Sequence, residues 1–117
     1  MDEATFDKLA DATLKALMAE IEDGVADGIE DIDLQGSVLT IELEDGGTYV
    51  INKHAANKEI WLSSPKSGAA HYAFDPASGR WQPTRGGADL HAVLSAEFSA
   101  IAGAAVELAP VAPGSRG

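Results

Sequence analysis

The sequence predicts an α+β fold: a two-layer α-β sandwich in which two helices cover one face of an antiparallel sheet. Apolar residues recur at helical spacing near the start of the chain and again after Asp89. Between these regions, short segments alternate apolar and polar residues and are separated by turn-forming residues, which is typical of antiparallel strands. The 117 residues suit one domain. The order helix, strands, helix therefore favours one sheet, of roughly five to seven strands, with both helices on the same face.

The first predicted helix begins after Asp2, whose side chain suits an N-cap. A stripe at three- and four-residue spacing is expected to face the core: Phe6, Leu9, Ala10, Leu14, Leu17, Met18 and Ile21. Gly24 is expected to end the helix as a left-handed C-cap.

The central part of the chain predicts a hairpin followed by shorter strands. Residues 38–43 alternate, residues 44–47 are turn formers and residues 48–53 are rich in β-forming side chains. The polar stretch before residue 38 is expected only to lead into the first strand. The remaining strands are expected at residues 60–62, at residues 71–74 and around Trp81.

The second predicted helix begins at Asp89, a suitable N-cap. Its buried stripe is expected to be Leu90, Leu94, Phe98, Ile101 and Ala105. Gly103 is expected to weaken the last turn. The domain is predicted to span residues 1–107, with a proline-punctuated, flexible tail at residues 108–117.

Strand alternation predicts which side chains the helices leave uncovered. If Ile60 and Leu62 face the core, Glu59, Trp61 and Ser63 face outward. By the same argument Thr48, Val50 and Asn52 face outward if Tyr49 and Ile51 are buried. Trp61 and Asn52 are therefore expected on a sheet face that meets solvent or a partner.

Composition excludes several classes of function. The chain has no cysteine, so any metal must be bound by oxygen or histidine. No apolar run approaches the ~20 residues of a membrane span. The acidic N-terminus lacks the features of a signal or transit peptide, so we expect the protein, if this is the full chain, to stay in the compartment where it is made.

Charge is strongly asymmetric along the chain. The net charge is −11, and residues 1–45 hold 14 of the 19 acidic groups. This distribution disfavours nucleic acid, which needs a basic surface, and favours cations or a basic protein surface as partners. An acidic chain that is merely soluble is the alternative.

Motifs for catalysis are missing from the sequence. His54, His71 and His91 form no zinc or di-iron motif, and no nucleophile elbow, phosphate loop or dinucleotide fingerprint is present. Residues 31–42 approach an EF-hand loop, but Gln35 stands where Asp or Asn is required, and an alternating strand follows in place of a helix.

Carboxylates crowd the end of the first helix, where the helix dipole disfavours negative charge. We expect them to form an acidic shelf that holds hard or borderline cations loosely. The residues concerned are Glu20, Glu22, Asp23, Asp27, Glu30, Asp31 and Asp33, with Asp7 and Asp11 nearer the start of the helix. A solvated acidic face that prevents edge aggregation is the alternative.

Several stretches together resemble the frataxin family, in particular its bacterial branch. The most specific is residues 47–65, which contain Ile51-Asn52-Lys53 and then Ile60-Trp61-Leu62-Ser63-Ser64-Pro65. Residues 6–11, 36–41 and 89–97 add to the likeness, which covers about residues 3–106 in order.

The resemblance implies an α-β sandwich that binds iron through an acidic ridge on the first helix and first strand. It also implies a role in iron-sulfur cluster assembly, exerted on a complex of cysteine desulfurase and scaffold protein. On this basis the acidic residues named above are the metal-binding ridge. The partner-binding sheet face falls on Asn52, Lys53, Glu59 and Trp61. This chain departs from its relatives at His54, usually Gln or Arg, and at His71, where several have Arg.

Our hypothesis is an iron-binding protein, monomeric or oligomerising with iron, that docks on the desulfurase-scaffold complex and modulates its rate. It acts as a regulator or iron donor rather than as an enzyme. Weakly bound ferrous or ferric iron is the expected ligand, with other divalent cations as alternatives. The competing hypotheses are an iron-storing or ferroxidase-type oligomer and an interaction module that needs no metal.

Overall fold

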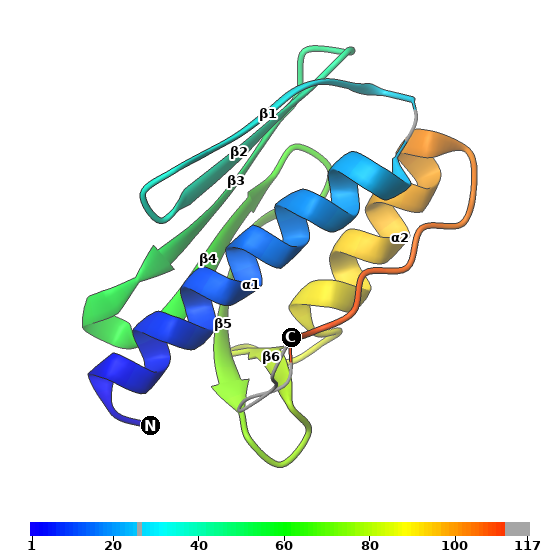
Figure 1. Cartoon of the computed structure of the whole chain (residues 1–117). Coiled ribbons are helices and arrows are strands. Elements are labelled where there is room, and N and C mark those ends of the chain that lie inside the picture. Colours follow the sequence, from blue (N-terminus) through cyan, green and yellow to red (C-terminus); the bar gives the residue numbers. More distant parts are fainter. Residues whose placement is uncertain (26, 112–117) are drawn as a thin grey trace.

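Two helices lie on one side of a six-stranded sheet in the computed structural model, which describes residues 1–25 and 27–111 (Figure 1). The strands are consecutive neighbours in the order β1-β2-β3-β4-β5-β6, and every pair is antiparallel. The elements, in chain order, are α1 (Glu3–Gly24), β1 (Ile29–Gln35), β2 (Val38–Leu43), β3 (Thr48–His54), the short 3-10 helix η1 (Ala55–Asn57), β4 (Glu59–Ser64), β5 (Gly68–Asp75), β6 (Arg80–Pro83) and α2 (Leu90–Ala102). The predicted fold class is confirmed.

Helix α1 begins as the sequence predicts but ends differently. Asp2 caps it by accepting a hydrogen bond from the Thr5 backbone N–H at 2.8 Å. Gly24 lies inside the helix, so the predicted left-handed glycine cap is wrong. Val25 is the C-cap in an extended conformation, and its N–H donates to the Ile21 carbonyl at 3.0 Å. An extended cap buries the Val25 side chain in the core.

Strand β1 is the element that the sequence did not predict. It occupies the polar stretch before residue 38 and pairs with β2 along its length, with an irregularity between Ile29 and Asp31. Ile32 and Leu34 are only half-buried, because β1 is an edge strand. Residues 31–35 do alternate polar and apolar side chains, but aspartate is disfavoured in strands, and the pattern does not extend to Ile29 across the irregularity.

The hairpin of β2 and β3 is confirmed, and the burial of its residues follows the predicted alternation. Tyr49 and Ile51 are buried, whereas Thr48 is exposed and Asn52 half-buried. In β4, Ile60 and Leu62 face the core while the alternate residues face outward.

The C-terminal region is more firmly packed than predicted. Asp89 caps α2, and Gly103 ends it in a left-handed conformation with φ of 69°. Ala105 lies beyond the helix and is exposed, so it does not belong to the buried stripe. Leu108, expected at the start of the flexible tail, is 6% exposed and packs in the core, and its N–H donates to Ser95 Oγ at 2.9 Å. Residues 112–117 of the expected tail lie outside the described residues.

The core fills the space between the sheet and the helices. Trp81 of β6 is fully buried, meets Phe6 of α1 and Phe74 of β5 edge-on, and donates its indole N–H to Thr13 Oγ1 at 3.2 Å. The last strand is thereby tied to the first helix. Within the part of the chain that the structure describes, neither helix combines the length and apolarity needed to cross a bilayer.

His91, near the start of α2, is 1% exposed, and neither ring nitrogen has a hydrogen-bond partner among the described residues. Burial lowers the pKa of His91 to about 4, because the charged imidazolium would lose its hydration; the nearby Asp89 carboxylate opposes this shift. In the unfolded chain an ordinary histidine pKa of ~6.5 applies. Protonation therefore favours the unfolded state as the pH falls below ~6.5.

We predict that His91 costs the protein about 2 kcal/mol of unfolding free energy between pH 7 and pH 5. The measurement is urea denaturation at both pH values, for the native chain and for His91→Leu. The variant should lose less stability on acidification by about that amount. An identical pH dependence in the two proteins would contradict the prediction.

Candidate functional site

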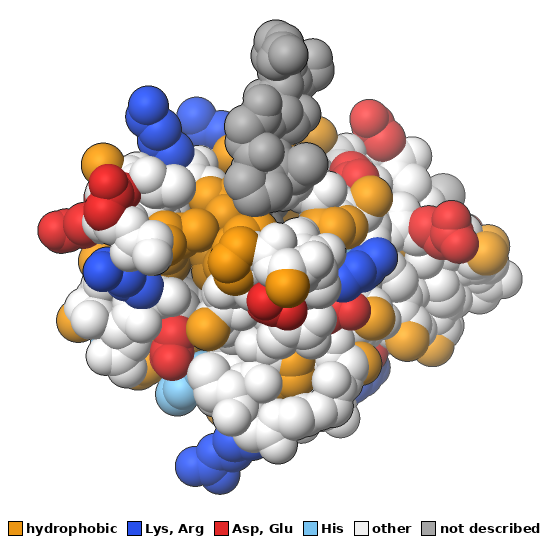
Figure 2. Space-filling view, turned by 90° about the horizontal axis from the view of Figure 1, so that it is seen from below, with side chains coloured by type: hydrophobic (Ala, Val, Ile, Leu, Met, Phe, Trp, Pro, Cys, Tyr) orange, Lys and Arg blue, Asp and Glu red, His pale blue; other side chains and the backbone are white. Residues whose placement is uncertain are grey.

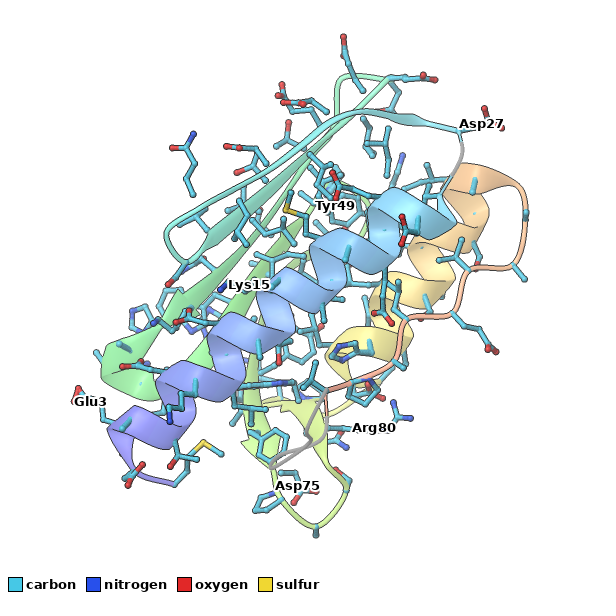
Figure 3. The ribbon with its side chains drawn as sticks, viewed as in Figure 1. Glu3, Lys15, Asp27, Tyr49, Asp75 and Arg80 are labelled. Atoms are coloured by element: carbon cyan, nitrogen blue, oxygen red, sulfur yellow. The ribbon has the colours of Figure 1, made fainter. Side chains whose placement is uncertain are left out.

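The nine acidic residues of the predicted ridge do not form one continuous site. Figure 3 shows Glu3 and Asp27 at opposite ends of α1. Asp7 and Asp11 lie in the first half of the helix, about 20 Å along its axis from its last turn. The other seven lie at or after the end of the helix and on β1.

Asp7 and Asp11 are held by Lys53 of β3. The Lys53 Nζ atom lies 3.4 Å from Asp7 Oδ1 and 3.3 Å from Asp11 Oδ1, and Asp11 also accepts a hydrogen bond from Ser37 Oγ at 3.1 Å. Desolvation acts to lower the pKa of Lys53, but the hydrogen bonds that it donates to Asp11 and Asp7, together with their negative charges, raise it. The charge of these two acids is thus already partly balanced within the protein.

The same contacts correct the placement of Lys53, which was expected on the partner-binding sheet face. Strand alternation puts it on the side of Tyr49 and Ile51, toward α1, and its side chain is only 17% exposed. Lys53 therefore connects the sheet to the first helix. Asn52, Glu59 and Trp61 do lie on the uncovered side.

Of the remaining acids, Glu22, Glu30 and Asp31 line the gap between the end of α1 and β1. A hollow of about 350 Å³ lies there, lined by Ile21, Glu22, Val25, Ile29, Glu30, Asp31 and Ile32. The last turn of α1 contains no basic residue to offset the negative end of the helix dipole. Glu20 points elsewhere, since its Oε2 atom lies 3.5 Å from the Ala109 N–H. Asp23, Asp27 and Asp33 are exposed beside the hollow.

These carboxylates are not arranged as a finished metal site. Among the described residues, histidine and carboxylate side chains nowhere gather in threes in a way that could hold a metal ion. The donors are hard oxygen atoms on exposed side chains, which suit a cation that keeps most of its water. Figure 2 shows another side of the molecule, where basic and acidic side chains are interspersed.

The sheet face away from the helices, called the outer face here, has Trp61 of β4 at its centre. The register aligns Val38 of β2, Asn52 of β3, Trp61 of β4 and His71 of β5 in one row across four strands. Cross-strand neighbours point to the same side of a sheet, so these side chains form one surface. Helices α1 and α2 both lie on the opposite side (Figure 1).

Two imidazole rings sandwich the indole of Trp61. The His54 ring lies 3.7 Å from it with an interplanar angle of 7°, and the His71 ring lies 4.1 Å away at 6°. The Trp61 indole N–H donates to Glu59 Oε1 at 2.8 Å, and His71 Nδ1 lies 3.8 Å from the same oxygen. The stack holds the Trp61 ring between its two neighbours, and its N–H hydrogen bond is satisfied.

The sequence identified Trp61 but not the stack. In the sequence, His54 and His71 stand out as departures from related proteins, but nothing places them beside Trp61. A stack across three strands depends on the strand register, which no local sequence pattern encodes. The register of β3, β4 and β5 is the signal that would have found it.

Glu97 of α2 is a further polar centre that sequence reasoning missed. Its carboxylate accepts hydrogen bonds from Tyr49 Oη at 2.7 Å, Ser64 Oγ at 2.6 Å and Ser67 Oγ at 2.6 Å. These donors outweigh the desolvation of the carboxylate and lower the pKa of Glu97. All three hydrogen-bond donors belong to the protein itself. The Glu97 carboxylate therefore links α2 to the sheet and to the loop after β4.

The fold and the site together define a small α-β sandwich protein with an acidic helix-strand edge and an uncovered sheet face. A family model described as a frataxin-like domain matches residues 1–104. The chain belongs to the frataxin family.

Named relatives come from bacteria and from mitochondria. The mitochondrial frataxin of Arabidopsis thaliana is 38% identical over 112 residues, a match that covers 92% of this chain and 59% of that protein. The iron-sulfur cluster assembly protein CyaY of Neisseria meningitidis serogroup B is 41% identical over 97 residues, covering 81% of this chain and 88% of that protein. The chain thus spans about three-fifths of the plant relative and most of the bacterial one.

Solved structures share the fold along nearly the whole chain. Frataxin from Psychromonas ingrahamii superposes with a TM-score of 0.79 at 28% identity, covering 93% of this chain and 99% of that one. Trimeric frataxin from Saccharomyces cerevisiae, complexed with ferrous iron, gives a TM-score of 0.68 at 35% identity and covers 88% of both chains.

Proposed function

We propose that this protein binds iron weakly at its acidic edge, docks through the outer face on the complex of cysteine desulfurase and scaffold protein, and thereby modulates iron-sulfur cluster assembly. Support comes from the bacterial relative named for iron-sulfur cluster assembly and from the yeast relative complexed with ferrous iron. The observation that carries the proposal is the uncovered sheet face with Trp61 stacked at its centre.

The acidic edge fits iron as a loosely held ligand. Glu22, Glu30 and Asp31 line the hollow between α1 and β1, and oxygen donors of this kind suit ferrous iron and other hard cations. Because their side chains are exposed and do not converge, water must supply most of the coordination shell. We place iron at this hollow rather than at Asp7 and Asp11, which Lys53 already neutralises in part.

The outer face fits a protein partner. Trp61 is a large aromatic group on a face that no other part of the described chain covers, and aromatic side chains at the centre of an interface carry much of its binding energy. The two flanking imidazoles fix the ring before binding, so a partner loses little conformational entropy in meeting it.

The protein acts in this proposal as a regulator or iron donor, not as an enzyme. The cysteine thiolates of cluster chemistry belong to its partners, since this chain has no cysteine. We place it where clusters are assembled, which is the cytoplasm of a bacterium or the mitochondrial matrix of a eukaryote. The trimeric yeast relative makes an oligomer the second candidate state.

The double variant Glu22→Gln/Glu30→Gln should bind ferrous iron at least about tenfold more weakly while folding as well as or better than the native chain. It removes two negative charges from a crowded surface, which relieves repulsion but takes donors from the hollow. Anaerobic calorimetry gives the iron affinity, and urea denaturation gives the stability. The matched control is Glu3→Gln/Glu107→Gln, which removes two exposed carboxylates away from the hollow. Equal iron affinity in the two double variants would refute the assignment.

Trp61→Ala should fold but bind the desulfurase-scaffold complex about 30-fold more weakly, since an aromatic anchor contributes about 2 kcal/mol to binding. Its cost in folding stability should stay near 1 kcal/mol, because the indole packs on the outer face and not in the core. Lys15→Ala is the control, since Lys15 is exposed on α1, on the other side of the sheet (Figure 3), and should leave the affinity unchanged. Affinity should be measured by biolayer interferometry. Unchanged affinity, or a loss of several kcal/mol in stability, would count against the docking face.

A further inference from the structure

Strand β6 is shorter than the strand it pairs with. β5 runs from Gly68 to Asp75, but its register with β6 extends only from Tyr72, opposite Pro83, to Asp75, opposite Arg80. One more ladder bond follows, from the Thr84 N–H to the His71 carbonyl at 2.9 Å. Residues 68–70 therefore pair with β4 on one side and with no described strand on the other.

The direction of the free backbone groups follows from the alternation of an antiparallel ladder. The N–H and C=O of one residue point toward the same neighbour, and the next residue points the other way. The His71 carbonyl points toward β6, so the N–H and C=O of Ala69 point the same way. Neither has a backbone partner on that side among the described residues. Ala69 therefore presents an open strand edge.

There is room beside this edge for another strand. A hollow of about 450 Å³ is lined by Ala69, Ala70 and His71 of β5 and by residues 83–86. A second, of about 410 Å³, lies on the α2 side and shares Ala70, Pro83 and Gly86 with the first. Space thus exists on both sides of the sheet plane where β6 stops. The small side chains there allow a strand to approach to the usual ~4.8 Å.

The charge at this edge selects the ligand. His71, Thr84 and Arg85 line the first hollow, and no acidic residue does. Glu97 lines the second hollow, but its carboxylate already accepts three hydrogen bonds from within the protein. Arg85 forms no ion pair with the described residues, so its guanidinium is available to a carboxylate of a ligand. On a chain with a net charge of −11, this hollow is a local site for negative charge.

We propose that the open edge of β5 binds an extended acidic peptide segment of a partner protein, which adds to the sheet as a strand in line with β6. The main chain of the peptide would bond to the N–H and C=O of Ala69, and a carboxylate side chain would meet Arg85. Main-chain bonds supply affinity in this mode of recognition, and alternate side chains supply specificity. Neither iron nor the desulfurase complex is needed, so the site can be tested on its own.

The probe is a fluorescein-labelled peptide of alternating valine and glutamate, six residues long, titrated into the full chain by fluorescence polarisation. We expect saturable binding, slower amide exchange at Ala69 by NMR, and binding weakened about tenfold or more in Arg85→Glu. Lys15→Glu makes the same charge change on an exposed residue of α1 and should shift the affinity less than about twofold. The same peptide with N-methyl groups on alternate residues cannot donate the hydrogen bonds of the ladder and should not bind. This control leaves the protein unchanged, so it holds even if Arg85→Glu affects folding.

Three results would overturn the proposal. The first is the absence of saturable binding, and the second is equal affinity for the N-methylated peptide. The third is concentration-dependent protection of Ala69 in the protein alone, with dimers seen by sedimentation, which would show that a second copy of the chain occupies the edge. Because none of these measurements involves the desulfurase complex or iron, their failure would leave the proposed function untouched.

Discussion

Two helices cover one face of the sheet, and the opposite face has no layer above it within the described structure. Strand alternation then divides every strand into residues that pack against α1 and α2 and residues that remain outside. Tyr49, Ile51, Ile60 and Leu62 belong to the first group, and Asn52 and Trp61 to the second. The surface that we assign to partner docking is therefore a direct consequence of how the core is built.

The polar contacts on the two sides of the sheet have different consequences. On the helix side, Lys53 binds Asp7 and Asp11, and Glu97 accepts from Tyr49, so these charged groups fasten helices to strands. Beyond the end of α1, carboxylates gather without any base in the last turn, against the preference of the helix dipole. Carboxylates that repel one another and oppose the helix dipole are expected where they bind a ligand. We therefore assign iron binding only to the C-terminal end of α1 and the neighbouring strand.

Periodicity predicted both helices, the β2-β3 hairpin and the outward position of Trp61, because each follows from the pattern of one segment. It did not predict β1, whose alternation covers only residues 31–35 and depends on aspartates, which are disfavoured in strands. The inward position of Lys53 could have been predicted, because it lies two residues after Ile51 in β3 and strand alternation places it on the same side as Tyr49 and Ile51. Its bonds to α1, like the imidazole stack on Trp61, join residues of different elements, and only the folded chain brings them together.

The central claim is that this protein modulates an iron-sulfur cluster machine by docking on it. The most direct measurement is the rate of sulfide release by the desulfurase-scaffold complex at increasing concentrations of the full chain, with and without ferrous iron. If the protein docks as proposed, the rate should change with concentration and then level off, because the docking sites on the complex fill. A rate that stays constant at every concentration, in both iron conditions, would contradict it.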